Sequence, residues 1–367
     1  MDFGFNDDQR ELRATVRQVL DKECTVGALR SFDEASPEGR TALSAERWRV
    51  LAELGAPSLL VPEASRGLGL NDVDLVGVLE ESGWAALPEP LLETAALAAP
   101  LLATLLPAPQ AELALGAIVD HGLTAAVGGI DVSLGGPTSP TTVSADGRLT
   151  TPRVVGARTA KVLVLACRDT DSGWQVHAVP AVDCLIESTP VLDTTRDVST
   201  VHWPLSADTL LAYGVTADAV VQVLADRAAA GSAAVLLGLA DRMITMAADY
   251  AKDRQQFGKP IGSFQAVKHL LANARVKLEF ARPATYRAAW SLATAQPSVS
   301  HDASMAKAMA SDAADLAARV ALQVHGAIGY TWECDLHFFM KRTWALSAAW
   351  GDASTQRRLV LAQAKRG

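Results

Sequence analysis

Aromatic and charged residues are both scarce in this chain of 367 residues: aromatic side chains make up 5% of it and charged side chains 20%. Apolar residues make up 49%, and alanine and leucine dominate them. This composition argues against a disordered polymer and favours a helical protein with a large core. A chain of this length usually divides into roughly two or three domains.

Cysteine is also rare, with four residues at positions 24, 167, 184 and 334. No pair has the spacing of a CxxC motif, and no histidine stands at the spacing of a zinc ligand. We therefore expect free, reduced thiols, no disulfide framework and no metal site.

Positive charge is in deficit, since the formal net charge is −8. Such a surface repels a polyphosphate, so nucleic acid is not an expected partner, although local arginines can still bind one anionic cofactor. The apolar stretch at residues 95–106 is interrupted by Pro100 and is too short to cross a bilayer. The first residues lack the basic region of a signal peptide. We expect a soluble, cytoplasmic protein without a membrane partner.

Hydrophobic periodicity divides the chain into three parts. Residues 1–111 have helical spacing, and the segment begins with a capping-box pattern at Asn6 and Gln9. Asp72 stands where it could cap a further helix. Residues 112–215 are rich in β-branched residues separated by turn residues, which predicts a compact antiparallel β domain.

In that β domain, residues 160–167 predict a central strand, and residues 169–173 predict a hairpin turn. Helical spacing returns in residues 216–367. Four long helices are expected there, at about residues 220–254, 264–292, 300–324 and 337–364. The predicted fold class is α+β: an N-terminal helical domain, a middle β domain and a C-terminal four-helix bundle.

Two motifs in the last part are specific when they occur together. The first is Arg254-Gln-Gln-Phe257-Gly258 followed by Gln265, and the second is Gln-Val-His-Gly-Ala-Ile-Gly-Tyr from Gln323 to Tyr330. Together with the order of the domains, they resemble the flavin-binding segments of acyl-CoA dehydrogenases, and the resemblance covers nearly the whole chain.

The resemblance implies that the chain binds FAD. In that family these segments hold the adenine–pyrophosphate arm of a flavin whose ring lies in a neighbouring subunit. Arginine offers a permanently charged fork to a pyrophosphate, and glycine lets the backbone approach a phosphate closely. The residues implied to contact the cofactor across a subunit interface are Arg254, Phe257, Gln265, Gln323, Val324, His325 and Gly326.

The glutamate that removes a proton from the substrate in such enzymes is missing at its usual position. The corresponding stretch reads Ala349-Trp350-Gly351-Asp352, with glycine at the glutamate position. Asp352 is adjacent, but one residue of offset on a helix rotates a side chain by about 100°. We expect Asp352 to cap the last helix instead, and we assign no catalytic residue.

Some family members carry the base at the start of the first long helix of the bundle. In register, that position falls at about Ala228, with Asp226 and Arg227 just before it. We expect Asp226 to cap that helix and Arg227 to pair locally. Residues 118–136 also lack the Thr-Glu-x-x-x-Gly-Ser-Asp-like loop that contacts the flavin ring in catalytic members.

These departures resemble the non-catalytic subunit of the heteromeric α2β2 acyl-CoA dehydrogenases of actinobacteria, several of which act on bulky steroid-side-chain CoA thioesters. The first hypothesis is therefore a subunit that contributes FAD contacts while a homologous partner supplies the glutamate for acyl-CoA dehydrogenation. A homomeric enzyme with Asp352 or Asp226 as a relocated base is a second hypothesis, and a flavin-free scaffold is a third.

Overall fold

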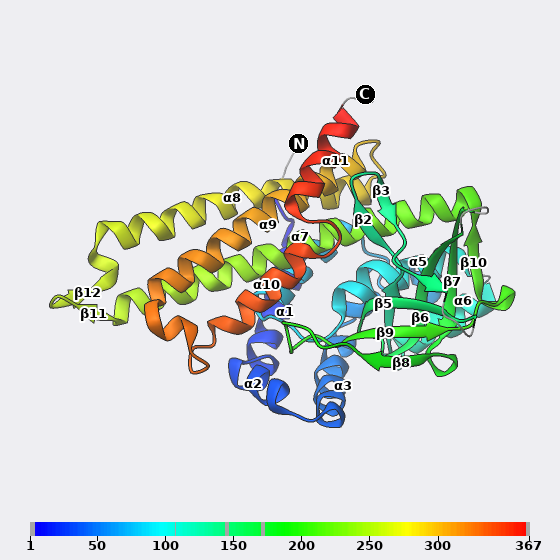
Figure 1. Cartoon of the computed structure of the whole chain (residues 1–367), viewed down its shortest axis with the longest axis horizontal. Helices are drawn as coiled ribbons and strands as arrows, with labels where there is room; N and C mark the ends of the chain where they lie inside the picture. The colour runs from blue at the N-terminus through cyan, green and yellow to red at the C-terminus, as the bar shows by residue number, and fades with distance from the viewer. Residues whose placement is uncertain (1–3, 107, 144–146, 170–172, 365–367) are drawn as a thin grey trace. The chain divides into compact units, whose positions relative to one another are not determined.

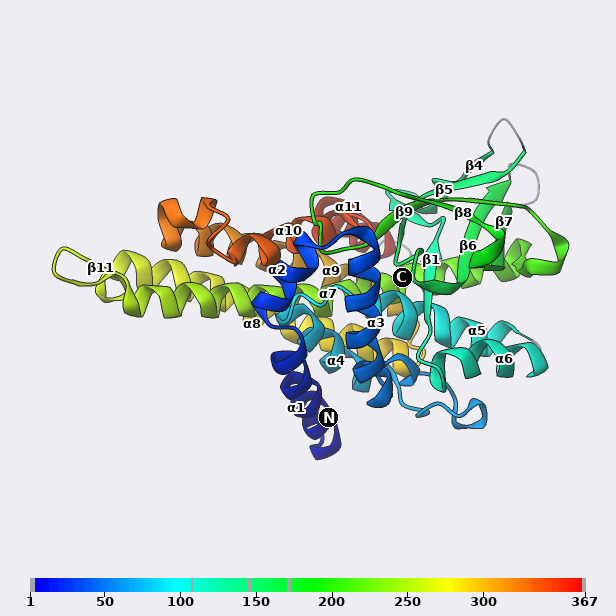
Figure 2. The ribbon, with the colours of Figure 1, turned by 90° about the horizontal axis from the view of Figure 1, so that it is seen from below.

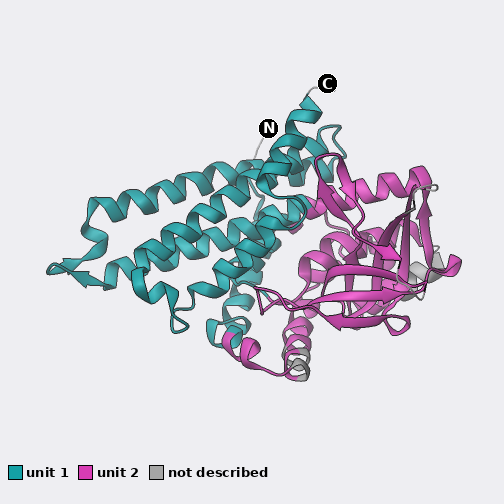
Figure 3. Ribbon diagram, viewed as in Figure 1, with its two compact units in different colours: residues 1–29, 76–87, 229–367 teal, residues 30–75, 88–228 magenta. Residues whose placement is uncertain are grey.

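The computed structural model describes residues 4–106, 108–143, 147–169 and 173–364. Contacts divide the chain into two compact units, coloured separately in Figure 3. Unit 1 comprises residues 1–29, 76–87 and 229–367, and unit 2 comprises residues 30–75 and 88–228. Helices, a β region and helices follow one another as predicted, which confirms the α+β class.

Unit 1 is helical, and its long helices run alongside one another in Figures 1 and 2. α9 packs against α8, α10 and α11. The buried face of α9 is mostly alanine, whose small side chains let neighbouring helices approach closely. The helices of this unit are α1 (Asp7–Glu23), the later turns of α4 (Asp72–Trp84), most of α7 (Gly214–Asp253), α8 (Gln265–Ala293), α9 (Val299–His325), the short η7 (Gly326–Tyr330), α10 (Leu336–Ala348) and α11 (Ala353–Ala364).

α4 crosses α7 at a pair of glycines. A Cβ atom on Gly83 would lie 2.0 Å from the carbonyl oxygen of Val235, and one on Gly238 would lie 1.9 Å from that of Glu80. Any side chain at either position would force the helices apart. The two glycines therefore fix how α7, which leads to the first cofactor motif, sits in unit 1.

Unit 2 contains the β region. Its described strands form two four-stranded sheets, in the orders β1-β6-β7-β10 and β4-β5-β9-β8, and a separate β2-β3 ribbon. The strands are β1 (Thr124–Gly128), β2 (Asp131–Ser133), β3 (Gly136–Thr138), β4 (Thr142–Val143), β5 (Leu149–Val155), β6 (Ala160–Asp169), β7 (Gly173–Pro180), β8 (Leu185–Ser188), β9 (Val198–Trp203) and β10 (Leu210–Tyr213).

Side chains from both four-stranded sheets form one core cluster. Leu163 and Val179 come from the first sheet, and Val201 and Trp203 from the second. The Trp203 indole N–H is satisfied inside this core, because it donates to the Thr151 hydroxyl at 3.0 Å. The two sheets therefore pack face to face as a sandwich.

The predicted central strand and hairpin are confirmed by β6 and β7, whose register pairs Asp169 with Gly173. The turn residues 170–172 lie outside the described residues. The expectation of a wholly antiparallel domain is wrong at one pair, since β1 pairs with β6 in parallel. A long stretch of chain separates these two strands, so it can return β6 in the same direction as β1.

The remaining helices of unit 2 either precede the strands of this sandwich in the chain or lie between them. They are the end of α2 (Val26–Glu34), α3 (Pro37–Glu53), the π-helix η3 (Leu92–Ala98), α5 (Ala99–Leu105), α6 (Ala108–Val119) and the short η1 (Ala56–Ser58), η2 (Glu63–Ser65), η4 (Ala181–Asp183) and η5 (Ala207–Thr209).

Two of the expected helix boundaries change. α7 begins at Gly214, six residues before the expected start at residue 220. The single last helix expected over 337–364 is wrong, because a turn at residues 349–352 divides it into α10 and α11. By length and composition α7 could cross a membrane, but 89% of its apolar window is buried in the protein, as in a core helix.

Candidate functional site

The first predicted cofactor segment is a short hairpin that follows α7. Its strands β11 (Gln255–Gln256) and β12 (Lys259–Pro260) pair antiparallel. Phe257 and Gly258 turn the chain with φ angles of 53° and 75°, as in a type I′ turn. The Phe257 side chain is 91% exposed. Phe257 therefore contributes little to the core of this chain and is accessible to a partner.

Arg254 lies between α7 and this hairpin, and backbone hydrogen bonds hold it on both sides. Its N–H donates to the carbonyl of Tyr250 at 2.9 Å, and its own carbonyl accepts from the N–H of Ile261 at 2.8 Å. The side chain is exposed, and no described residue forms an ion pair or hydrogen bond with its guanidinium. A fixed backbone that carries an unpaired guanidinium suits the binding of a phosphate group.

The second predicted segment lies at the end of α9. The His325 ring stacks on Tyr250 of α7, with ring centroids 4.5 Å apart and planes 20° apart. Its Nδ1 lies 2.8 Å from the carbonyl of Ala321, which can only accept, so Nδ1 carries the proton. His325 therefore joins the last turns of α7 and α9, which agrees with its having no acid–base role.

Each of the two cofactor segments has an exposed glutamine side chain. Gln323 is exposed at the end of α9, and Gln265 is exposed at the first position of α8. Val324 and His325 are buried, so their backbone is what could reach a ligand. Gly326 ends α9 with φ 66° and ψ −138°, and no heavy atom lies within 4 Å of the place a Cβ would occupy.

Figures 1 and 2 both place the β11–β12 hairpin and η7 at the same end of the unit 1 helices. The structure thus gathers the predicted cofactor residues at one end of a single unit. An unpaired guanidinium, two exposed amides and an open glycine backbone are the donor set that a dinucleotide pyrophosphate requires. The residues present therefore fit the adenine–pyrophosphate arm of FAD.

Large apolar side chains are exposed on the same segments and on α8. Tyr330 ends η7 and is 80% exposed, Trp332 follows η7 and is 66% exposed, and Phe280 on α8 is 67% exposed. Several exposed aromatic side chains on one unit are typical of a surface that another protein covers.

The position at which the sequence analysis expected the glutamate, Gly351, lies in the turn between α10 and α11. Trp350 and Gly351 have φ angles of 58° and 82°, so both are left-handed, and Gly351 is buried. A glutamate at position 351 would have to adopt a conformation that L-residues avoid. The left-handed backbone at position 351 is therefore unfavourable for a glutamate side chain.

The Asp352 side chain caps the N-terminus of α11, as the sequence predicted. The Thr355 N–H donates to its Oδ1 at 2.7 Å. This backbone hydrogen bond is the main reason that the pKa of Asp352 is below its usual range. An exposed carboxylate that caps a helix and stays ionised is poorly suited to receive a carbon-bound proton.

Lys307, which the sequence analysis did not single out, lies beneath this turn. Its side chain is fully buried, and Nζ donates to the carbonyls of Ser347 at 3.1 Å and Gly351 at 3.4 Å and to the Ser311 hydroxyl at 3.2 Å. Burial lowers the pKa of Lys307 to about 7, against the opposing charges of Asp315 and Asp352. The sequence signal for Lys307 is a lysine that stands among the alanines of the buried face of α9.

The alternative position near Ala228 holds groups that are already engaged. The Gln222 side-chain amide donates to Oδ1 of Asp226 at 3.0 Å. The expectation that Asp226 caps a helix is wrong, because α7 begins twelve residues earlier, at Gly214. Arg227 pairs with Asp72 at 3.2 Å, which is a contact distant in sequence and not a local one.

Asp72 does not cap α4 as the sequence suggested. The Asn71 side chain accepts from the N–H of Val73 at 2.8 Å and so caps the helix instead.

Residues 118–136, where the flavin-ring loop was expected to be missing, form the end of α6, β1 and the β2–β3 ribbon. Within the described residues, no group of three or more His, Cys, Asp or Glu side chains could hold a metal ion.

Comparisons with known proteins agree with these observations. "Acyl-CoA dehydrogenase IpdE2" of Mycolicibacterium smegmatis is 31% identical over 360 residues, 98% of this chain and 99% of that protein. The ChsE4-ChsE5 complex from Mycobacterium tuberculosis contains a chain of TM-score 0.86 and 25% identity that matches all of both chains. A variant of the Tcur3481-Tcur3483 steroid acyl-CoA dehydrogenase gives a TM-score of 0.84 at 26% identity, over 98% of this chain and 99% of that one.

Two solved structures of PigA with FAD share this fold at 18% and 19% identity. Family models match most of the chain: the acyl-CoA dehydrogenase N-terminal domain matches residues 6–112, and the acyl-CoA dehydrogenase C-terminal domain matches residues 219–365. The chain belongs to the acyl-CoA dehydrogenase family.

Proposed function

We propose that this chain is the non-catalytic subunit of a heteromeric, FAD-dependent acyl-CoA dehydrogenase. It contributes contacts to FAD across a subunit interface, and a homologous partner supplies the catalytic glutamate. One contrast supports this proposal above all. The chain keeps an unpaired Arg254 at an exposed end of unit 1, yet it has glycine at the position of the base.

Arg254 is the residue that would carry most of the cofactor binding. Its guanidinium would pair with the pyrophosphate, while the amides of Gln265 and Gln323 and the open backbone at Gly326 would add hydrogen bonds. Phe257 would cover part of the nucleotide. FAD, when bound, accepts the hydride that leaves the substrate β-carbon, and none of these residues takes part in that transfer.

The partner subunit would have to supply the proton acceptor. A carboxylate must reach the weakly acidic proton next to the thioester carbonyl. Gly351 has no such group, and the carboxylate of Asp352 accepts the backbone N–H of Thr355. A relocated base at Asp226 is equally disfavoured, because that side chain is buried and bonded to Gln222.

The proposed substrates are CoA thioesters with bulky acyl groups, including steroid side chains. The support for this class is the similarity to a solved steroid acyl-CoA dehydrogenase and to a chain of the ChsE4-ChsE5 complex. Rates of flavin bleaching with a steroid-side-chain CoA thioester and with butyryl-CoA test the substrate class separately from the cofactor role.

The cofactor role is tested by co-expressing the chain with a homologue that carries the glutamate and measuring FAD by its visible absorbance. We expect a yellow complex, and we expect Arg254→Ala to weaken FAD retention by about tenfold or more, because a hydrogen bond to a charged group is lost. Lys252→Ala is the matched control. Lys252 carries the same charge near the end of the same helix but pairs with Asp249 at 2.7 Å.

Two results would contradict this proposal. A chain that purifies alone as a yellow, active homomer would support the relocated base, and Asp352→Ala or Asp226→Ala would then abolish the bleaching. Equal FAD retention in the Arg254→Ala and Lys252→Ala complexes would instead support the flavin-free scaffold.

A further inference from the structure

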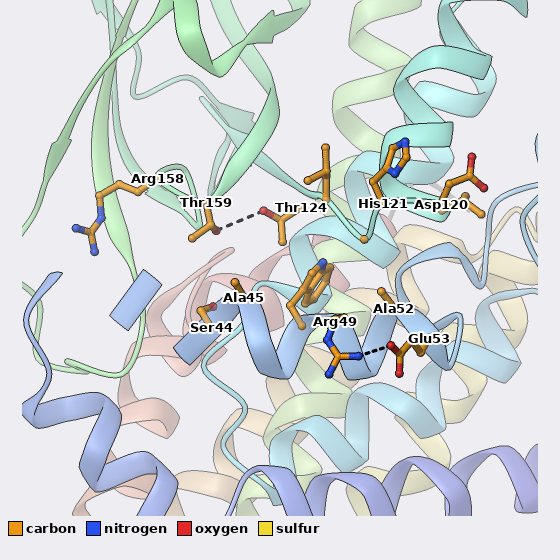
Figure 4. A pocket seen from close by; sticks show the side chains of 14 residues that line it. Ser44, Ala45, Arg49, Ala52, Glu53, Asp120, His121, Thr124, Arg158 and Thr159 are labelled. Carbon is orange, nitrogen blue, oxygen red and sulfur yellow. Dashed lines mark hydrogen bonds and ion pairs between the residues drawn. The ribbon is translucent and has the colours of Figure 1, made fainter. Parts of the chain in front are cut away.

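A cavity lies wholly within unit 2, whereas the cofactor residues described above belong to unit 1. It has a volume of about 710 Å³, which is the size of a small-molecule site. One wall is a face of α3, and the other walls are residues 119–124, where α6 leads into β1, and the turn before β6 (Figure 4). The apolar lining is formed by Ala45, Trp48, Ala52, Val119 and Leu123.

Trp48 gives this cavity a specific polar group. Its side chain is 4% exposed, and its indole Nε1 is a buried donor without a hydrogen-bond partner among the described residues. A buried N–H that makes no hydrogen bond carries an unrecovered desolvation penalty. Trp203 shows the contrast within the same unit, since its indole N–H donates to Thr151. An acceptor from outside the chain would satisfy Trp48.

Gly122 keeps space free beside that donor. A Cβ on Gly122 would lie 2.8 Å from the Cβ of Ala52 and 4.0 Å from Cδ1 of Trp48, the carbon bonded to Nε1. The edge of the indole that carries the donor therefore faces Gly122, which itself lines the cavity. Its φ of 56° also favours glycine at this position.

The charged groups around the cavity neutralise one another. Arg49 pairs with Glu53 on α3, as Figure 4 shows. Arg158 pairs with Asp197 at 2.7 Å, and Asp120 pairs with Arg66. Each charged group in these pairs already has a partner of opposite charge, so none of them remains to bind a charged ligand.

The Thr124 hydroxyl donates to that of Thr159 (Figure 4). The Thr159 hydroxyl donates in turn to the carbonyl of Gly156. Both threonine protons are therefore engaged. Among the buried side-chain atoms of the described lining, the indole Nε1 of Trp48 is the one without a hydrogen-bond partner, whereas the His121 side chain is exposed. This favours a ligand that is uncharged and that presents a hydrogen-bond acceptor.

We propose that this cavity of unit 2 binds an uncharged ring compound through a carbonyl oxygen that accepts the indole N–H of Trp48. The site is separate from the proposed FAD contacts, and it does not depend on the function proposed above. Binding is reversible and involves no covalent step.

Two ligands of the same shape test this proposal on the full chain in its co-purified complex. Tetralone is a bicyclic ketone, and tetralin is the same ring system without the carbonyl oxygen. Affinities are measured by ligand-observed NMR titration, with progesterone as a larger ketone that fills more of the cavity. We expect tetralone to bind about tenfold more tightly than tetralin, as a recovered hydrogen bond predicts.

Trp48→Phe keeps an aromatic wall and removes the N–H donor, so the difference between tetralone and tetralin should disappear. Gly122→Leu should abolish the binding of all three compounds, because its side chain would occupy the space beside the indole. Lys252→Ala is the control, and it should change none of these affinities because Lys252 is exposed and does not line the cavity.

Three outcomes would overturn the proposal. They are the absence of saturable binding for all three compounds, equal tetralone and tetralin affinities in the unmodified chain, and a preference for tetralone that survives in Trp48→Phe. Circular dichroism and thermal melting of each variant show whether it folds. If Gly122→Leu does not fold, the Trp48→Phe comparison decides alone.

Discussion

Replacing Lys307 by methionine should remove a pH dependence of stability that the structure predicts. The Lys307 ammonium group is buried beneath the α10–α11 turn, and burial lowers its pKa from 10.5 to about 7. A pKa shift of one unit corresponds to about 1.4 kcal/mol. The full shift therefore corresponds to roughly 5 kcal/mol of lost stability when the amine is protonated in both states.

The direction of the effect follows from proton binding. Between about pH 7 and pH 10 the unfolded chain holds the lysine proton and the folded chain does not. The free energy of unfolding therefore rises with pH in this window, by up to about 1.4 kcal/mol per unit. Below about pH 7 both states are protonated, so this contribution to the slope vanishes and the penalty is fully present.

The measurement is urea denaturation of the purified complex at several pH values from about 7 to about 9.5, for the unmodified chain and for Lys307→Met. Methionine has a similar volume and no charge, so the fold should be retained. Lys277→Met makes the same change at an exposed site of α8 and should leave the slope unchanged. Parallel slopes for the unmodified chain and Lys307→Met would refute the reasoning.

Three further predictions concern single side chains. Gly351→Ala should lower stability by about 1–2 kcal/mol in thermal melting, because alanine disfavours the φ of 82°. For the same backbone reason, Gly351→Glu should give no flavin bleaching without the partner. Bleaching by the Gly351→Glu chain alone would contradict this account of the turn. Asp352→Ala should cost about 1 kcal/mol through the lost cap of α11 and leave the kcat of the complex unchanged; a large fall in kcat would make Asp352 catalytic. Glu89→Gln should cost about 3–5 kcal/mol in urea denaturation, since Glu89 is buried against Arg47 at 2.9 Å; replacing both residues by methionine should recover most of the loss, and no recovery would show that the charge pair itself stabilises unit 2.

Sequence pattern predicted the fold well where one local rule was sufficient. The capping box at the start of α1 is confirmed, since the Gln9 N–H donates to Asn6 Oδ1 at 2.8 Å and the Asn6 N–H donates to Gln9 Oε1 at 3.1 Å. The β6–β7 hairpin is confirmed as well. These features depend on neighbours in sequence, which a single chain displays directly.

The errors fall where distant contacts decide. Helical periodicity continues through residues 349–352, although Gly351 followed by Asp352 is also the pattern of a helix end and a new cap. The role of Lys307 depends on carbonyls forty and forty-four residues away, and the engagement of Arg227 depends on Asp72. The motifs predicted candidate cofactor residues, but their spacing could not show that Arg254 is unpaired among the described residues.

The central claim is that this chain serves a flavin of its neighbour and holds none of its own. The most direct test is the ratio of FAD to protein chains in the purified complex, determined from flavin absorbance and quantitative amino-acid analysis. The account predicts half as many flavins as chains, with all bleaching lost when the partner's glutamate is replaced by glutamine. One flavin for every chain, or bleaching that survives that replacement, would contradict it.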